Sequence, residues 1–262
     1  MKKMKIWLAA ILVCGAGLFT SCDKTGTDLS DRVLGKWIVA DLNGEACPTS
    51  WKSVVTFESA KKGYYSLSEI TTMTWENKTP AEVTFQGNGF TAIEEEGDYK
   101  SVLTVTVNSI TDKEMRLKTD WTITSGSLIL LHEIYDERWV RVTDNFEQAV
   151  LGTWEAQVPD GSLGSGGAKQ QTWRWEFKAD GTYVFSLKNG DAEWQVFEDI
   201  ISDYFVDGPL LCTRWQNTAS SDEQRDWWEI ESIQNGKMKW TALRIDENLL
   251  THTETLVLNK TK

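Results

Sequence analysis

The stretch LSDRVLGKW at residues 29–37 recurs without a gap as FEQAVLGTW at residues 146–154, an offset of 117 residues. Each copy begins with a segment long enough for one or two helical turns and then enters a strand through Gly-x-Trp. A later match, ERWV at residues 137–140 with ETLV at residues 254–257, returns to the same offset. Matches that keep one order along the chain indicate a tandem duplication, with its junction near residues 143–146.

Within each half, apolar and polar residues alternate with a period of two, which is typical of half-buried antiparallel strands. Residues 115–123 show this alternation in the first half, and Trp173, Trp175 and Phe177 alternate with polar residues in the second. Turn-forming pairs such as Asp-Gly and Asn-Gly recur at hairpin spacing. Each half, of about 115 residues, is long enough for roughly eight short strands, and a sheet of that size removes its exposed edges by closing on itself.

We therefore predict an all-β fold of two tandem small antiparallel β-barrels, each a meander preceded by a short helical turn. The first barrel is expected over residues 29–144 and the second over residues 145–262.

Cys47 and Cys212 fall in different halves without metal-ligand spacing. This placement favours two buried thiols over a disulfide between the halves.

A short helical lead, Leu-Gly-x-Trp at the first strand, the motif Phe-x-x-Asp-Gly-x-Tyr at residues 177–183 and a following meander resemble the small bacterial lipocalin-like (calycin-type) domains, which are often lipoproteins. The resemblance covers nearly all of the chain after the first 28 residues. It implies that Trp37 and Trp154 plug the closed ends of the two barrels.

In that family the plugging tryptophan packs against a basic residue from a late strand. The resemblance gives Arg138 or Arg141 this role in the first half. The equivalent positions of the second half hold Thr255 and Leu258, neither of which is basic. The identity of the second partner is therefore left open by the sequence.

The first residues are typical of a secretory signal peptide. Three lysines precede an apolar run over residues 6–19, which is too short to span a bilayer comfortably. The pair Ser21-Cys22 resembles the lipobox of bacterial lipoproteins, although an ordinary cleaved signal is the alternative. The resemblance implies a signal peptide over residues 1–21, lipidation of Cys22 and a polar tether over residues 22–28. We expect a lipid-anchored protein of the cell envelope, in the outer membrane on its periplasmic or cell-surface face.

The charge of the chain restricts its partners. The net charge is −12, and it becomes −15 without residues 1–21, which contain three lysines and no acid. No basic patch interrupts this acidity, so binding to nucleic acid is not expected. Anionic lipid surfaces repel such a chain, so we expect the lipid to make the membrane contact.

Motifs of common catalytic sites do not occur in the sequence. It contains no His-Glu-x-x-His, no Gly-x-Ser-x-Gly and no phosphate-binding loop. Its two histidines, His132 and His252, are isolated residues in predicted strands. We therefore expect a protein that is not an enzyme and that has no cofactor and no metal site.

Aromatic residues are the positive signal. Eight of the 14 tryptophans follow residue 145, more than one small core can absorb. We predict that they line a cavity for a small apolar or aromatic ligand in the second barrel. The predicted lining residues are Trp173, Trp175, Phe177, Tyr183, Phe185, Trp228 and Trp240.

Two other functions are compatible with the sequence. Trp227 and Trp228 are adjacent, so on a strand they point to opposite faces, and one of them lies outside or at a rim. Exposed tryptophans that stack on sugar rings would make a carbohydrate-binding module whose partner is an oligosaccharide. Barrels filled by side chains would instead indicate a structural or protein-interaction lipoprotein.

Overall fold

A computed structural model describes residues 28–59, 64–70, 75–158, 171–246, 248 and 250–261. The predicted signal peptide and Cys22 lie outside these residues. The described chain is almost entirely β, with two antiparallel nine-stranded sheets, which confirms the all-β prediction. It divides into two compact units after Thr143, and the short segment Pro48–Trp51 belongs to the second unit.

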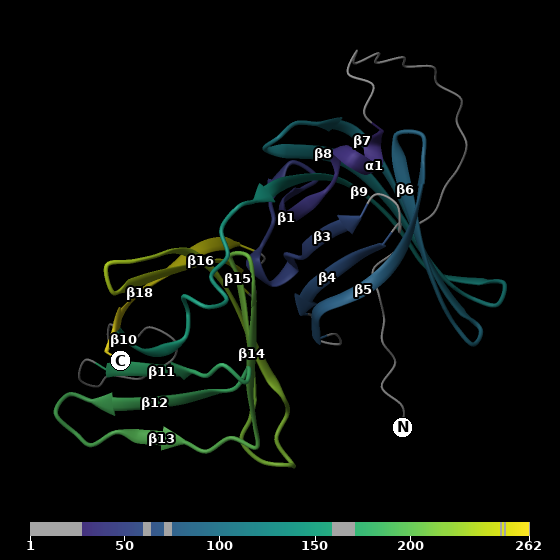
Figure 1. Ribbon diagram of the computed structural model, residues 1–262. Coiled ribbons are helices and arrows are strands. Elements are labelled where there is room, and N and C mark those ends of the chain that lie inside the picture. Colours follow the sequence, from purple (N-terminus) through teal and green to yellow (C-terminus); the bar gives the residue numbers. More distant parts are fainter. Residues whose placement is uncertain are drawn as a thin grey trace. The chain divides into compact units, whose positions relative to one another are not determined.

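The first unit is an antiparallel meander (Figure 1). It begins with helix α1 (Leu29–Arg32), and its strands are β1 (Gly35–Leu42), β2 (Glu45–Ala46), β3 (Val54–Ser59), β4 (Tyr64–Ile70), β5 (Trp75–Gln86), β6 (Gly89–Glu96), β7 (Tyr99–Ile110), β8 (Glu114–Ser125) and β9 (Leu128–Val142). Strand β1 pairs with β3 on one side and with β9 on the other. These pairings join the first and last long strands, so the sheet closes on itself.

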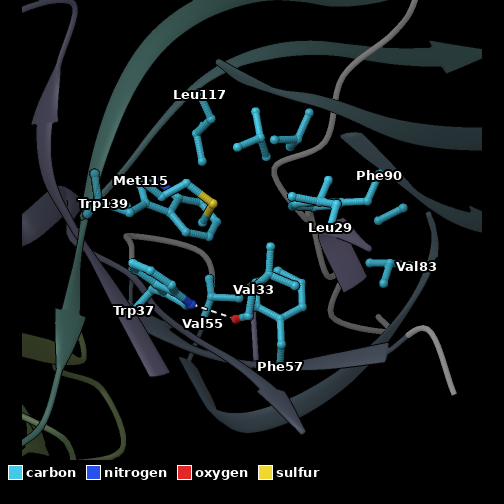
Figure 2. Close-up of a cluster of buried hydrophobic side chains, with 14 of the residues drawn as sticks. Leu29, Val33, Trp37, Val55, Phe57, Val83, Phe90, Met115, Leu117 and Trp139 are labelled. Atoms are coloured by element: carbon cyan, nitrogen blue, oxygen red, sulfur yellow. Dashed lines mark hydrogen bonds between the residues drawn. The ribbon is translucent and has the colours of Figure 1, made fainter. Parts of the chain in front are cut away.

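Alternate residues of these strands build the interior of the first unit (Figure 2). Trp37, Phe57 and Met115 are each at most 2% exposed, and they come from β1, β3 and β8. Leu29 of α1 and Val33, which follows the helix, add two apolar side chains to this core. The period of two predicted from the sequence thus separates inward from outward residues.

The second unit is also an antiparallel nine-stranded sheet. Its strands are β10 (Gly152–Val158), β11 (Gln171–Phe177), β12 (Tyr183–Asn189), β13 (Gln195–Phe197), β14 (Ile201–Asp207), β15 (Leu210–Gln216), β16 (Gln224–Gln234), β17 (Lys237–Ile245) and β18 (Thr251–Lys260). Strand β10 pairs with β11 and with the last strand, β18. The sheet ends at β13 and β14, and a single bridge between Thr182 and Asp203 connects the β12 and β14 sides.

Both sheets begin with the same glycine geometry. Gly35 has φ +110° and lies opposite Phe57, and Gly152 has φ +112° and lies opposite Phe177. Residues with a Cβ rarely adopt this backbone conformation. A Cβ on Gly35 would also lie 2.6 Å from Nη1 of Arg141. Glycine is therefore required where the lead segment turns into the first strand.

The two Gly-x-Trp tryptophans occupy equivalent places. Trp37 and Trp154 are both fully buried. Trp37 Nε1 donates a 2.7 Å hydrogen bond to the carbonyl of Val33, and Trp154 Nε1 donates one of 2.6 Å to Val150. Each ring is thus tied to the segment four residues before it. That segment is a helix in the first unit, whereas a turn at residues 147–150 precedes β10.

A basic side chain lies over each of these rings. The guanidinium carbon of Arg141 is 4.1 Å from the centre of the Trp37 ring, while Arg138 pairs with Asp41 instead. In the second unit, Nζ of Lys260 is 5.0 Å from the centre of the Trp154 ring. Lys260 lies two residues after the position equivalent to Arg141, and therefore on the same face of its strand.

Candidate functional site

The second unit contains a cavity of about 600 Å³. Side chains from β10, β11, β12, β13, β15, β16, β17 and β18 line it, together with residues that follow β13 and β15. Six of the seven residues singled out from the sequence are among them: Trp173, Trp175, Tyr183, Phe185, Trp228 and Trp240. The fold thus brings together side chains that are up to 67 positions apart in the sequence.

These aromatic rings form one continuous wall. The Trp175 ring centre is 5.2 Å from that of Phe185 and 5.2 Å from that of Trp240. Trp173 meets Phe185 edge to face at 5.6 Å, and Trp228 lies 5.6 Å from Trp240. Contacts of this kind hold each ring in one orientation. The apolar surface of the cavity is therefore formed before any ligand arrives.

Phe177, the seventh residue, does not line the cavity. It is 2% exposed and packs edge to face on Tyr204, with ring centres 4.8 Å apart. Phe177 ends β11 and lies opposite Gly152 of β10, two positions from the buried Trp154 of that strand. Phe177 lies on the same face of β11 as Trp173 and Trp175, as the alternation predicts. The rings of Tyr183, Tyr204 and Trp240 surround it there, so it does not reach the cavity.

Several further apolar side chains line the cavity without having been predicted. They are Val158, Leu187, Phe197, Trp215 and Leu256. Leu187 follows Phe185 by two residues on β12, so the period that identified Phe185 also places Leu187 on the inner face. Phe197 lies on the three-residue strand β13, which is too short to show a period.

Three carboxylates also line the cavity, from Asp199, Asp226 and Glu254. Asp226 precedes Trp228 by two residues on β16. Glu254 precedes Leu256 by two on β18. The strand alternation therefore places both positions on the inner face, although only aromatic residues were predicted to line the cavity. Asp199 follows β13 outside any strand, and no periodic signal identifies it.

Arg244 connects two of these carboxylates. Its Nε lies 2.9 Å from Oε2 of Glu254, and its Nη2 lies 2.9 Å from Oδ1 of Asp226. Its guanidinium carbon is 4.5 Å from the centre of the Trp228 ring. The second oxygen of Asp226 accepts a 2.7 Å hydrogen bond from Trp228 Nε1. This network fixes the orientation of Trp228 in the cavity wall.

Asp199 differs from the other two acids. Its Oδ1 is buried and has no hydrogen-bond partner among the described residues. Burial raises the pKa of the Asp199 carboxyl. Burial, together with the charge of Asp199, also raises the pKa of Tyr183. For Asp226, burial raises the pKa while the charge of Arg244 opposes this change.

Other tryptophans of the described chain lie elsewhere. Trp194 is covered by Arg174, whose guanidinium carbon is 3.5 Å from the ring centre. Trp51 is 61% exposed, and no other tryptophan of the described residues is mostly exposed. Trp227 is half-buried, while its neighbour Trp228 lines the cavity.

A smaller cavity, of about 250 Å³, occurs in the first unit. Charged side chains dominate its lining, including Asp41, Asp136 and Arg138. Arg138 is paired with Asp41 and lies 3.6 Å from Glu114. This smaller space offers little apolar surface, so the cavity of the second unit is the stronger candidate.

No protein-family model matches the chain, and no curated protein matches it. Among the described residues, no helix has the length and apolar character needed to cross a membrane. Within the same residues, no group of three or more His, Cys, Asp or Glu side chains is arranged to hold a metal ion. The candidate site is therefore defined by the geometry of the aromatic cavity.

Proposed function

We propose that this protein is a lipid-anchored lipoprotein of the cell envelope with two lipocalin-like barrels, the second of which binds a small apolar or aromatic ligand. The cavity of about 600 Å³ carries this proposal. Its volume falls within the range of about 300–1,000 Å³ that is usual for small-molecule sites. Its walls are mainly apolar, and contacts between the aromatic rings already hold them in place.

The preformed wall favours binding without reorganisation of the protein. A planar apolar ligand would exchange water for the rings of Trp173, Trp175 and Trp228, and it would lose little affinity to the ordering of side chains. The first barrel would have a different role, because its described phenylalanine rings pack on one another. Phe90, for example, contacts Phe57 at a ring-centre distance of 5.3 Å.

The positions of the tryptophans favour this function over a carbohydrate-binding surface. Sugar platforms need several exposed rings in a row. Within the described residues, Trp51 is the only tryptophan that is mostly exposed, and five of the eight second-half tryptophans line the cavity. The cavity also argues against a second barrel that is filled by its own side chains.

The proposal is tested with the neutral fluorescent probe N-phenyl-1-naphthylamine, which brightens in apolar surroundings. The mature chain carrying Cys22→Ser is titrated with the probe and compared with Leu187→Trp, which fills the cavity from β12. Val196→Trp adds the same ring on β13 at a position that is 53% exposed, and it serves as the matched control. We expect Leu187→Trp to weaken probe binding at least tenfold and the control to leave it unchanged.

Native mass spectrometry of the protein from its own host complements the titration. We expect a co-purifying small molecule that Leu187→Trp abolishes and Val196→Trp retains. A probe that binds Leu187→Trp as well as the parent protein would contradict a site in this cavity. Absence of both probe binding and a co-purifying molecule would contradict the function itself.

A further inference from the structure

We propose that the ligand of this cavity is a cation, an apolar or aromatic amine or quaternary ammonium whose charge lies against Asp199 and the aromatic faces. This inference rests on the proposed function, because it specifies the chemistry of a ligand for the same cavity. It adds the sign of the ligand's charge, which the aromatic wall alone does not determine.

The first observation is the charge of the lining. Among the described residues that line the cavity, the charged side chains are Asp199, Asp226 and Glu254, and all three are acidic. Arg244 supplies one positive charge to Asp226 and Glu254 together. With the three carboxylates ionised, this group has a net charge of −2. An anionic ligand would be repelled, whereas a cation would be attracted strongly in apolar surroundings of low dielectric.

The second observation is the unpartnered oxygen of Asp199. A buried acceptor without a hydrogen bond is unfavourable, and native structures rarely leave one in this state. The Oδ1 atom of Asp199 has no partner among the described residues, and its side chain lines the cavity. A hydrocarbon ligand would leave that oxygen unpaired. An ammonium group placed beside it would supply either a hydrogen bond or a direct charge contact.

The third observation is the kind of aromatic ring. The face of an indole attracts cations more strongly than the face of any other side-chain ring. Trp173, Trp175 and Trp228 all line the cavity. Trp228 already has one cation, the guanidinium of Arg244, at 4.5 Å from its ring centre. Several indoles next to a carboxylate form the kind of cage that binds quaternary ammonium groups.

The test uses three compounds that share one shape and differ in charge. Benzyltrimethylammonium is the cation, neopentylbenzene is its neutral isostere, and benzylsulfonate is the anion of similar size. Their affinities for the mature chain carrying Cys22→Ser are measured by displacement of N-phenyl-1-naphthylamine. We expect the cation to bind at least tenfold more tightly than neopentylbenzene, with benzylsulfonate the weakest of the three.

Asp199→Asn then separates charge from shape. We expect this variant to lower the preference for the cation below threefold and to leave the affinity for neopentylbenzene unchanged. Asp191→Asn, which removes an exposed acid between β12 and β13, is the matched control and should change neither affinity.

The outcomes distinguish the two proposals. Neopentylbenzene binding as tightly as the cation would overturn the charge inference while the proposed function stands. Failure of all three compounds and of the fluorescent probe would overturn both. The comparison in the parent protein decides the question even if Asp199→Asn does not fold.

Discussion

Asp199 connects protonation to both stability and binding. Burial raises the pKa of its carboxyl above the ordinary value of an aspartate, so the folded state holds this proton more tightly than the unfolded state does. The stability contributed by the protonated group is complete below that value. It is lost as the pH rises through the higher pKa of the folded state. A cation requires the ionised form, so its affinity changes in the opposite direction.

We therefore expect the affinity for benzyltrimethylammonium to increase with pH through the raised pKa of Asp199 and then to level off. Benzyltrimethylammonium carries a permanent charge, so the protein alone titrates. Tyr183, which faces Asp199, has a raised pKa and stays neutral, while Asp226, whose pKa burial also raises, accounts for any residual slope. Displacement titrations between about pH 4 and pH 7 measure this profile. A flat profile, or an equal slope in Asp199→Asn, would argue against Asp199 as the charged contact.

At the level of single residues, the sequence identified rings better than it identified charges. Trp173 and Trp175 alternate on a clear strand, so their shared face follows from the pleat. Asp226 and Glu254 have the same periodic relation to Trp228 and Leu256, but acidic residues are usually solvated, and the predicted lining contained aromatic residues only. Asp199 lies outside a strand, and only the three-dimensional structure places it at the cavity.

At the level of elements, the start of each sheet was predictable because it depends on local geometry. The glycine of the Gly-x-Trp motif has a backbone conformation that other residues rarely adopt. The tryptophan donates its indole hydrogen bond to the carbonyl four residues before it. The basic partner comes from a distant strand, and its register determines which side chain reaches the ring. That register is not readable from the sequence, which left Arg138 and Arg141 as alternatives and did not identify Lys260.

The two basic partners should contribute unequally to stability. Arg141 donates a 2.6 Å hydrogen bond to the Leu34 carbonyl and bonds two further carbonyls besides covering Trp37. Lys260 is exposed and lies 5.0 Å from the Trp154 ring centre. We expect Arg141→Met to lower the free energy of unfolding by about 2–4 kcal/mol. We expect Lys260→Met to lower it by less than about 1 kcal/mol.

Urea denaturation followed by circular dichroism measures both changes. Lys237→Met, at an exposed position that begins β17, controls for the loss of a surface charge. Equal losses in Arg141→Met and Lys260→Met would show that the ring contact alone determines stability, and that the carbonyl bonds of Arg141 contribute little.

At the level of the whole chain, two antiparallel nine-stranded sheets have different interiors. In the first unit, Phe57, Phe85 and Phe90 contact one another, with ring centres between 5.3 and 6.2 Å apart. In the second, indoles stand around a cavity of about 600 Å³. The excess of tryptophan after residue 145 predicted this difference, because large rings fixed edge to face can wall a space that they do not fill.

Attachment to the membrane is a property of the whole chain, and the proposal assigns it to Cys22, which lies outside the described residues. A charge of −15 after removal of residues 1–21 disfavours contact with anionic lipids, so attachment should depend on acyl chains at about 0.8 kcal/mol per buried methylene. We expect the parent protein to stay in the membrane fraction at high salt and Cys22→Ser to move to the soluble fraction. Cys47→Ser, which alters a buried thiol, is the matched control and should stay with the membrane. Release of the parent protein by salt, or retention of Cys22→Ser, would instead place the membrane contact on the folded units.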